Sequence, residues 1–136
     1  IYTSDAHLPG VDRELQVWPS HAVAGTEGAE VIKELKPERG DHVIQKRRYS
    51  AFYGTGLDSL LRDLKVDTLV LVGLVTNICI LHTAADAFFR GYQILVPEDG
   101  VEAPTEEDQK FGIKYIRTMY GCKITTVHEL MRKELT

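Results

Sequence analysis

Cys79 follows an apolar run at 68–74 and lies at the start of a helical pattern that begins at Asn77. A thiol at a helix start faces unpaired backbone N–H groups and the positive end of the helix dipole, which favour the thiolate. The same N–H groups can form an oxyanion hole for acyl transfer. The alternative is that Cys79 is a small buried packing residue, and its position alone leaves both interpretations open.

Two other strand ends carry polar side chains that could act with this thiol. Asp5 and His7 follow the first predicted strand, and Lys46 ends the second. A lysine ammonium beside a thiol lowers its pKa. Asp5 and His7, two residues apart on an extended chain, project to the same side and form a candidate pair of metal ligands. The sequence therefore indicates a thiol, an amine and a metal-binding pair at one edge.

The elements that must position these residues alternate along the chain. Strands are predicted at 1–5, 41–46, 68–74, 93–99 and 123–127, and helices at 26–35, 55–65, 77–92 and 105–120. This alternation is typical of an open, mostly parallel α/β sheet. Ligands bind such sheets beyond the carboxyl ends of the strands, where the polar residues above are expected.

Composition restricts the class of protein. The chain has 136 residues, of which 43% are apolar and 26% charged, as expected for one globular domain. A net charge of −4 argues against nucleic-acid or anionic-membrane partners, and no apolar run approaches the roughly 20 residues of a membrane span. The two cysteines, Cys79 and Cys122, form no CxxC pair, which favours a reducing, cytoplasmic location.

Three segments together resemble the isochorismatase-like cysteine hydrolases. "GLVTNICILHTAADAFFRGY" at 73–92 resembles their nucleophile segment, and "VIQKRRYSAFYGTGLDSLL" at 43–61 resembles their lysine segment. "SDAHLPGVDRELQVWPSHAVAGTEGAEV" at 4–31 is similar to the D-x-H and W-P-x-H motifs of the nicotinamidase/pyrazinamidase branch. The resemblance implies a Rossmann-like, three-layer α/β fold: an open, mostly parallel sheet with helices on both faces, in one domain at 1–136.

The resemblance also implies roles for individual residues. Cys79 is expected to be the nucleophile that attacks a carboxamide, with Lys46 beside it. The Leu74–Val75 bond is expected to be cis, and the Val75 and Cys79 amides to form the oxyanion hole. The implied ligands of one divalent metal, Zn²⁺ first with Fe or Mn as alternatives, are Asp5, His7 and His21, and the implied substrate-ring contacts are Trp18 and Tyr49.

One part of the family pattern has no counterpart in the 136 residues. The family's catalytic base is an aspartate at the end of an earlier strand, and the first strand–helix unit that carries it is missing here. The chain is therefore expected to be N-terminally incomplete. It would be inactive alone, or its sheet would be completed by a separate N-terminal segment.

The substrate stays open at this point. The metal motif favours nicotinamide, and thereby NAD salvage, whereas Asn77 and the "RYSAF" segment are closer to relatives that act on ureido or N-carbamoyl amides or on isochorismate. A non-catalytic α/β scaffold is the remaining alternative. The expected partner is a small-molecule amide, with neither nucleic acid nor membrane, and the resemblance implies a homo-oligomer.

Overall fold

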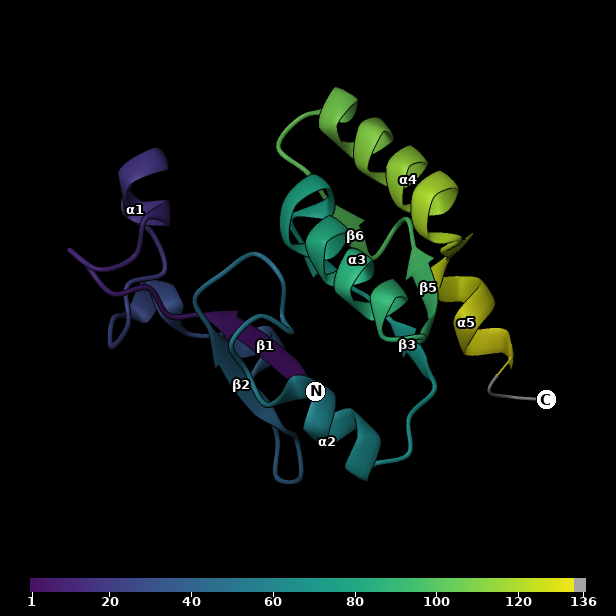
Figure 1. Ribbon diagram of the computed structural model, residues 1–136, viewed down its shortest axis with the longest axis horizontal. Helices are drawn as coiled ribbons and strands as arrows, with labels where there is room; N and C mark the ends of the chain where they lie inside the picture. The colour runs from purple at the N-terminus through teal and green to yellow at the C-terminus, as the bar shows by residue number, and fades with distance from the viewer. Residues whose placement is uncertain (134–136) are drawn as a thin grey trace.

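The computed structural model describes residues 1–133 and consists of parallel strands flanked by helices (Figure 1). Strand β1 (Tyr2–Asp5) pairs with β2 (Val43–Lys46), and a second sheet has the order β3 (Thr68–Val70), β5 (Gln93–Pro97), β7 (Lys123–Thr125). The short strands β4 (Gly73–Leu74) and β6 (Val101–Glu102) form a third pair. Every strand pair is parallel. The predicted α/β class with mostly parallel strands is thereby confirmed.

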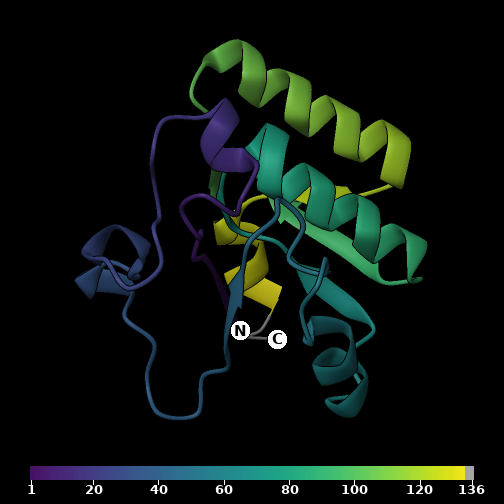
Figure 2. The ribbon, with the colours of Figure 1, turned by 60° about the vertical axis from the view of Figure 1, so that its left-hand side comes forward.

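Helices cover both sides of the β3–β5–β7 sheet. Helix α3 (Leu81–Phe89) and helix α4 (Glu106–Tyr120) lie side by side over one face, and α5 (Val127–Lys133) lies on the other (Figures 1 and 2). The core forms where Ala84, Ala87 and Ile116 of the helices meet Val96 of β5, because all four are fully buried. None of the described helices is long and apolar enough to cross a membrane.

Two further helices are short. Helix α2 (Leu57–Asp63) buries Leu57 and Leu61 in the core, within the predicted 55–65 range. Helix α1 (Glu14–Val17) is a single turn in the stretch that the sequence leaves irregular. Thr105 caps α4 as its spacing predicts, because its hydroxyl accepts a 3.1 Å hydrogen bond from the Asp108 amide.

The helix predicted at 26–35 does not form. Two single 3₁₀ turns, Glu27–Ala29 and Lys33–Leu35, stand in its place, with extended backbone at Glu30 between them. The apolar face that predicted the helix has nothing to pack against in the described structure, since Ile32 is 61% and Leu35 60% exposed. A short helix without such packing is only marginally stable in water.

The predicted strand at 68–74 is divided in two. Gly73 adopts a φ of +109°, which only glycine tolerates readily, and the chain changes partner there from β5 to β6. The helix predicted from Asn77 also begins differently, as a π-helical turn at Thr76–Ile80 that leads into α3. Cys79 therefore lies inside a widened turn and not at the first residue of α3.

Strands β1 and β3 both present an unpaired edge to the same cavity. Within residues 1–133, β1 pairs with β2 alone and β3 with β5 alone. A cavity of about 390 Å³ lies between them, lined by residues of β1, β3 and β4 together with Lys46 and Cys79. Val70 and Leu74 are 49% and 69% exposed at this cavity. The polypeptide thus leaves room for a further extended segment beside its two candidate reactive groups.

Candidate active site

Parallel pairing of β1 and β2 brings together the first two candidate residues. Asp5 and Lys46 are register partners at the carboxyl ends of these strands. The Lys46 ammonium donates to Asp5 Oδ1 at 2.5 Å and to the Arg48 carbonyl at 2.8 Å. Its Nζ also lies 3.7 Å from Cys79 Sγ. Asp5, Lys46 and Cys79 therefore meet at one sheet edge, as the strand-end rule predicts.

The electrostatics at Cys79 differ from the sequence expectation of a stabilised thiolate. Burial raises the pKa of the Cys79 thiol, and the Asp5 carboxylate acts in the same direction. The Lys46 ammonium and a backbone hydrogen bond from Val75 lower the pKa, but they do not outweigh burial. Because burial raises the pKa of the Cys79 thiol, its use as a nucleophile calls for a base.

Backbone hydrogen bonds to Val75 hold the turn that carries Cys79. The Leu74–Val75 peptide bond is cis, and the Val75 carbonyl accepts 3.1 Å hydrogen bonds from the Ile78 and Ile80 amides. Since the Val75 backbone also bonds to the Cys79 thiol, this amide is directed at the candidate reacting centre. The oxyanion-hole role that the resemblance implies for Val75 stays a prediction.

Helix α4 packs against the turn at Thr76–Ile80. The Asn77 side-chain amide donates to Asp108 Oδ1 at 3.1 Å. A Cβ added at Gly112 would stand 3.0 Å from Thr76 Cγ2 and 3.1 Å from the Asn77 nitrogen, so a larger residue here requires the turn to move by a few tenths of an ångström. Asp108 and Gly112 were not predicted as site residues, because their contact with the turn depends on how α4 packs.

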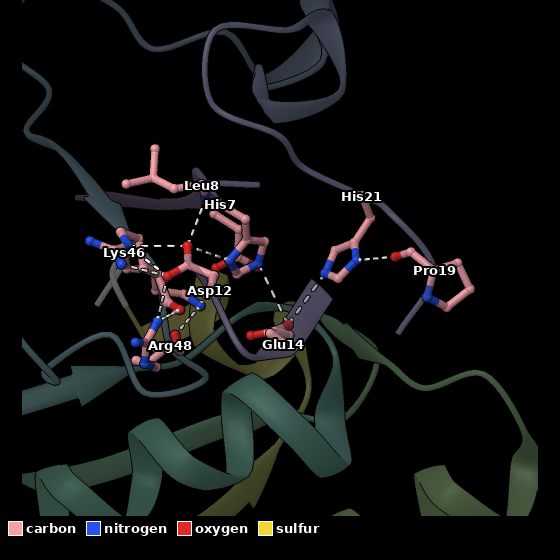
Figure 3. Close-up of polar contacts among 10 residues, drawn as sticks. His7, Leu8, Asp12, Glu14, Pro19, His21, Lys46 and Arg48 are labelled. Carbon is pink, nitrogen blue, oxygen red and sulfur yellow. Dashed lines mark hydrogen bonds and ion pairs between the residues drawn. The ribbon is translucent and has the colours of Figure 1, made fainter. Parts of the chain in front are cut away.

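A second cluster of polar groups forms between His7, Glu14 and His21 (Figure 3). An isolated parallel bridge pairs His7 with Val23, which brings the segment after His21 alongside His7. One ligand atom of each of the three residues lies within 4.8 Å of the others. Glu14 Oε1 is 3.5 Å from His7 Nε2 and 3.3 Å from His21 Nε2.

The cluster fits a divalent metal ion. His7 is fully buried, and both of its ring nitrogens lack a hydrogen-bond partner among the described residues. A buried polar group without a partner is costly, and a cation between the two imidazoles and the carboxylate removes that cost. Two imidazoles and a carboxylate are ligands that zinc accepts.

The membership of this cluster differs from the expected metal set in one residue. His7 and His21 are brought together as expected, whereas the Asp5 carboxylate is bound to Lys46 and Glu14 stands in the cluster. Asp5 follows from the D-x-H motif. Glu14 does not, because it enters through the unpredicted turn α1. In the sequence, only its position seven residues from both His7 and His21 points to Glu14 as a ligand.

Asp12 connects the histidine cluster to the lysine segment. Its carboxylate is 1% exposed and accepts hydrogen bonds from Arg47 and Arg48, so these arginines are paired and not free for substrate. The hydrogen bonds from Arg47 hold the pKa of Asp12 well below its usual range. Asp12 therefore remains an anion although it is buried.

The two expected substrate-ring residues contact each other. Trp18 Nε1 donates to the Tyr49 hydroxyl at 3.0 Å, and the His82 ring lies 5.3 Å from the Tyr49 ring. Tyr49 and Glu14 line a cavity of about 560 Å³ that is separate from the one lined by Cys79. Trp18 and Tyr49 are therefore joined to each other, and Tyr49 shares its cavity with Glu14 of the histidine cluster.

The family is evident from comparison with known proteins. Residues 1–129 match the isochorismatase domain. The chain is 34% identical over 104 residues to the isochorismatase family protein YaaI of Bacillus subtilis, covering 76% of this chain and 58% of YaaI. It is 41% identical over 100 residues to the ureidoacrylate amidohydrolase RutB of Pantoea ananatis, covering 73% of this chain and 40% of RutB. The chain thus spans about half the length of these relatives.

Solved structures agree in fold. N-carbamoylsarcosine amidase of Thermoplasma acidophilum matches at a TM-score of 0.85 and 44% identity, over 92% of this chain and 70% of that one. Nicotinamidase PncA of Bacillus subtilis matches at a TM-score of 0.85 and 32% identity, over 91% of this chain and 72% of that one. The pyrazinamidase of Pyrococcus horikoshii in complex with zinc matches at a TM-score of 0.83 and 28% identity, over 91% of this chain and 73% of that one. The expected resemblance is confirmed, and the chain belongs to the isochorismatase family.

Proposed function

We propose that this chain carries most of the active site of a metal-containing cysteine amidohydrolase, which converts nicotinamide to nicotinate and ammonia. The observation that carries the proposal is the convergence of Cys79 and Lys46, 3.7 Å apart, from separate strand ends. The histidine–glutamate cluster supports a metal-dependent member of the family, and the nicotinamidase and pyrazinamidase among the structural neighbours support the substrate.

The reaction follows the chemistry of a thiol nucleophile. Cys79 Sγ attacks the carboxamide carbon, the C–N bond breaks, and the thiol proton leaves with the amine as ammonia. Water then cleaves the thioester, which releases the carboxylic acid and restores the thiol. The Val75 and Cys79 amides stabilise the oxyanion in both steps, and the Lys46 ammonium stabilises the charge that develops at the reacting centre.

The proton transfer requires a base that residues 1–133 do not present at the thiol. Asp5 Oδ1 is bound to the Lys46 ammonium, and burial raises the pKa of the Cys79 thiol. We assign the base to a carboxylate on a strand that enters the 390 Å³ cavity from a segment outside residues 1–136. The unpaired edges of β1 and β3, which both line this cavity, support that assignment.

His7, Glu14 and His21 would hold the metal ion, with zinc first and iron or manganese as alternatives. When bound, the ion supplies a Lewis-acid site for a water molecule or the pyridine nitrogen of the substrate. Trp18 and Tyr49, whose side chains are joined by a hydrogen bond, would hold the flat ring beside it.

A related substrate is the second candidate. Identities of 44% to an N-carbamoylsarcosine amidase and 41% to a ureidoacrylate amidohydrolase favour an N-carbamoyl or ureido amide, on which the same thiol chemistry operates. These identities exceed the 32% to the nicotinamidase, whereas the metal cluster favours nicotinamide.

The test is ammonia release by the zinc-loaded protein, assayed alone and together with a polypeptide that supplies the proposed strand. Nicotinamide, pyrazinamide and N-carbamoylsarcosine are supplied in parallel, with Cys79→Ala as the inactive variant and Cys122→Ala as the control for the other thiol. Turnover of nicotinamide that Cys79→Ala abolishes supports the proposal. Turnover of N-carbamoylsarcosine alone selects the second candidate, and equal activity of Cys79→Ala excludes the mechanism.

A further inference from the structure

The two imidazoles of the histidine cluster are oriented by different acceptors. His21 Nδ1 lies 2.7 Å from the Pro19 carbonyl oxygen, which can only accept, so Nδ1 carries a hydrogen (Figure 3). Its Nε2 then faces Glu14 Oε1 at 3.3 Å. A backbone carbonyl on the far nitrogen is the usual way in which a protein fixes a metal-binding imidazole.

Among residues 1–133, no carbonyl accepts a hydrogen bond from the His7 ring. Its Nδ1 faces Asp12 Oδ2 at 3.7 Å, and its Nε2 faces Glu14 Oε1 at 3.5 Å. We propose that Asp12 is the positioning residue of the His7 ring: its carboxylate selects the Nδ1–H tautomer and leaves the Nε2 lone pair for the ion held with Glu14 and His21. This inference rests on the proposed metal centre but not on the identity of the amide.

The Asp12 carboxylate is suited to this task because it is held rigidly. Arg47 donates to Oδ1 from Nη2 at 2.5 Å and from Nε at 2.9 Å, and Arg48 Nη1 donates to the same oxygen at 3.0 Å. The Leu8 amide donates to Oδ2 at 2.7 Å. Arg47 Nε also donates to Oδ2 at 3.1 Å. The two arginines therefore hold the plane of the carboxylate, and Oδ2 faces both the Leu8 amide and His7 Nδ1.

The tautomer follows from charge at short range. At 3.7 Å the contact is longer than a hydrogen bond, so Asp12 acts on the ring chiefly as a buried negative charge. A lone pair on Nδ1 would face that charge unfavourably, whereas an N–H dipole is attracted to it. Because Asp12 and His7 are both almost fully buried, water does not screen this difference.

Asp12→Asn tests the inference, because it keeps the shape of the side chain and removes its charge. The matched control is Asp58→Asn, which removes another arginine-paired carboxylate, on helix α2. The first measurement is the His7 tautomer in metal-free protein, from ¹⁵N–¹H correlation spectra of the ring at pH 8. The second is the zinc dissociation constant, from competition with a chelator.

We expect the wild type and Asp58→Asn to show the Nδ1–H tautomer and equal zinc affinity. Asp12→Asn should lose the single tautomer and bind zinc about 10–100-fold more weakly, with the thermal midpoint as a check on folding. An Nε2–H ring in the wild type, or wild-type zinc affinity in Asp12→Asn, overturns the inference. A wild type that binds no zinc but whose tautomer responds to Asp12→Asn contradicts the metal function and not the positioning role.

Arg47→Met is a second variant in case Asp12→Asn does not fold. It removes the two-pronged contact and leaves Asp12 held by Arg48 and the Leu8 amide. We expect zinc affinity to fall severalfold while the Nδ1–H tautomer persists, because the charge of Asp12 remains. Loss of the tautomer with unchanged zinc affinity would show that the ring is not held through Asp12.

Discussion

The Lys46 ammonium is bound to the Asp5 carboxylate, with Nζ 2.5 Å from Oδ1, across the last register pair of β1 and β2. This ion pair divides the influence of Lys46 between two neighbours, because Cys79 Sγ lies 3.7 Å from the same nitrogen. Asp5 raises and Lys46 lowers the pKa of the Cys79 thiol. The reactivity of the thiol therefore depends on the balance within the pair.

Substitution of either partner should move thiol reactivity in opposite directions. Asp5→Asn removes an effect that raises the pKa of Cys79, so alkylation by iodoacetamide at pH 7–8 should accelerate. Lys46→Met removes an effect that lowers the pKa, and alkylation should slow. Below the pKa, one unit changes the thiolate fraction roughly tenfold. The pH dependence of the alkylation rate gives the pKa of the Cys79 thiol in each variant.

Cys122 provides the background for this measurement. It is 2% exposed, and burial raises the pKa of its thiol to about 11, so it should react little below pH 9. Cys79→Ser measures the remaining rate directly. Equal pH profiles for Asp5→Asn and the wild type would show that Asp5 does not act on the thiol.

Asn77→Asp should destabilise the fold at neutral pH. The Asn77 amide donates to Asp108 Oδ1 at 3.1 Å, and a carboxylate at position 77 would meet that anion without a donor. A lost hydrogen bond to a charged group costs about 1.5–3 kcal/mol. Urea denaturation should show the loss, and the double variant Asn77→Asp with Asp108→Asn should recover most of it. Equal losses in the single and double variants would exclude this contact as the cause.

Gly112→Ala should also destabilise the protein, against the usual preference of helices for alanine. Alanine gains about 1 kcal/mol over glycine within a helix, but overpacking typically costs about 1–3 kcal/mol. The added methyl group meets Thr76 Cγ2 at 3.0 Å and the backbone of Asn77, so the turn that carries Cys79 must shift. Lys114→Ala, on the exposed side of α4, is the control. A higher thermal midpoint for Gly112→Ala would show that the turn at Thr76–Ile80 moves at little cost, and it would contradict the prediction.

The open edges of β1 and β3 should cause residues 1–136 to self-associate when they are produced alone. Unpaired strand edges with exposed apolar side chains are sites of edge-to-edge pairing. Val70→Lys places a charge on β3, where the side chain is 49% exposed, and should reduce association in sedimentation velocity. Met131→Lys, on α5 with 57% exposure, adds the same charge away from the edges and should not. An equal effect of both variants would indicate a role of net charge alone.

The sequence predicted best those residues whose positions follow from periodicity and strand order. Asp5 and Lys46 end neighbouring parallel strands, so their meeting follows from the strand-end rule. Contacts made by irregular segments could not be foreseen in this way. Glu14 enters through one turn of helix, and Asp12 is buried and accepts hydrogen bonds from Arg47 and Arg48, contacts that neither periodicity nor strand order indicates.

Two predicted elements were wrong for reasons that lie outside their own residues. The helix at 26–35 has the correct periodicity, but residues 1–133 offer it no surface to pack against, as the exposure of Ile32 and Leu35 shows. The strand at 68–74 is continuously apolar, yet Gly73 divides it between two partners. Periodicity describes which face a segment could bury, whereas tertiary packing decides whether it is buried.

The spacing of the histidine–glutamate cluster has a mechanical consequence for the segment that carries it. His7, Glu14 and His21 follow one another at intervals of seven residues, and between them the chain has only the single turn α1. An ion bound by all three closes two short loops, as a covalent crosslink would. Opening of this segment then requires the ion to be released or the loops to stay closed, so the bound ion stabilises the closed state. Resistance of residues 8–20 to proteolysis should therefore rise with metal occupancy, independently of turnover.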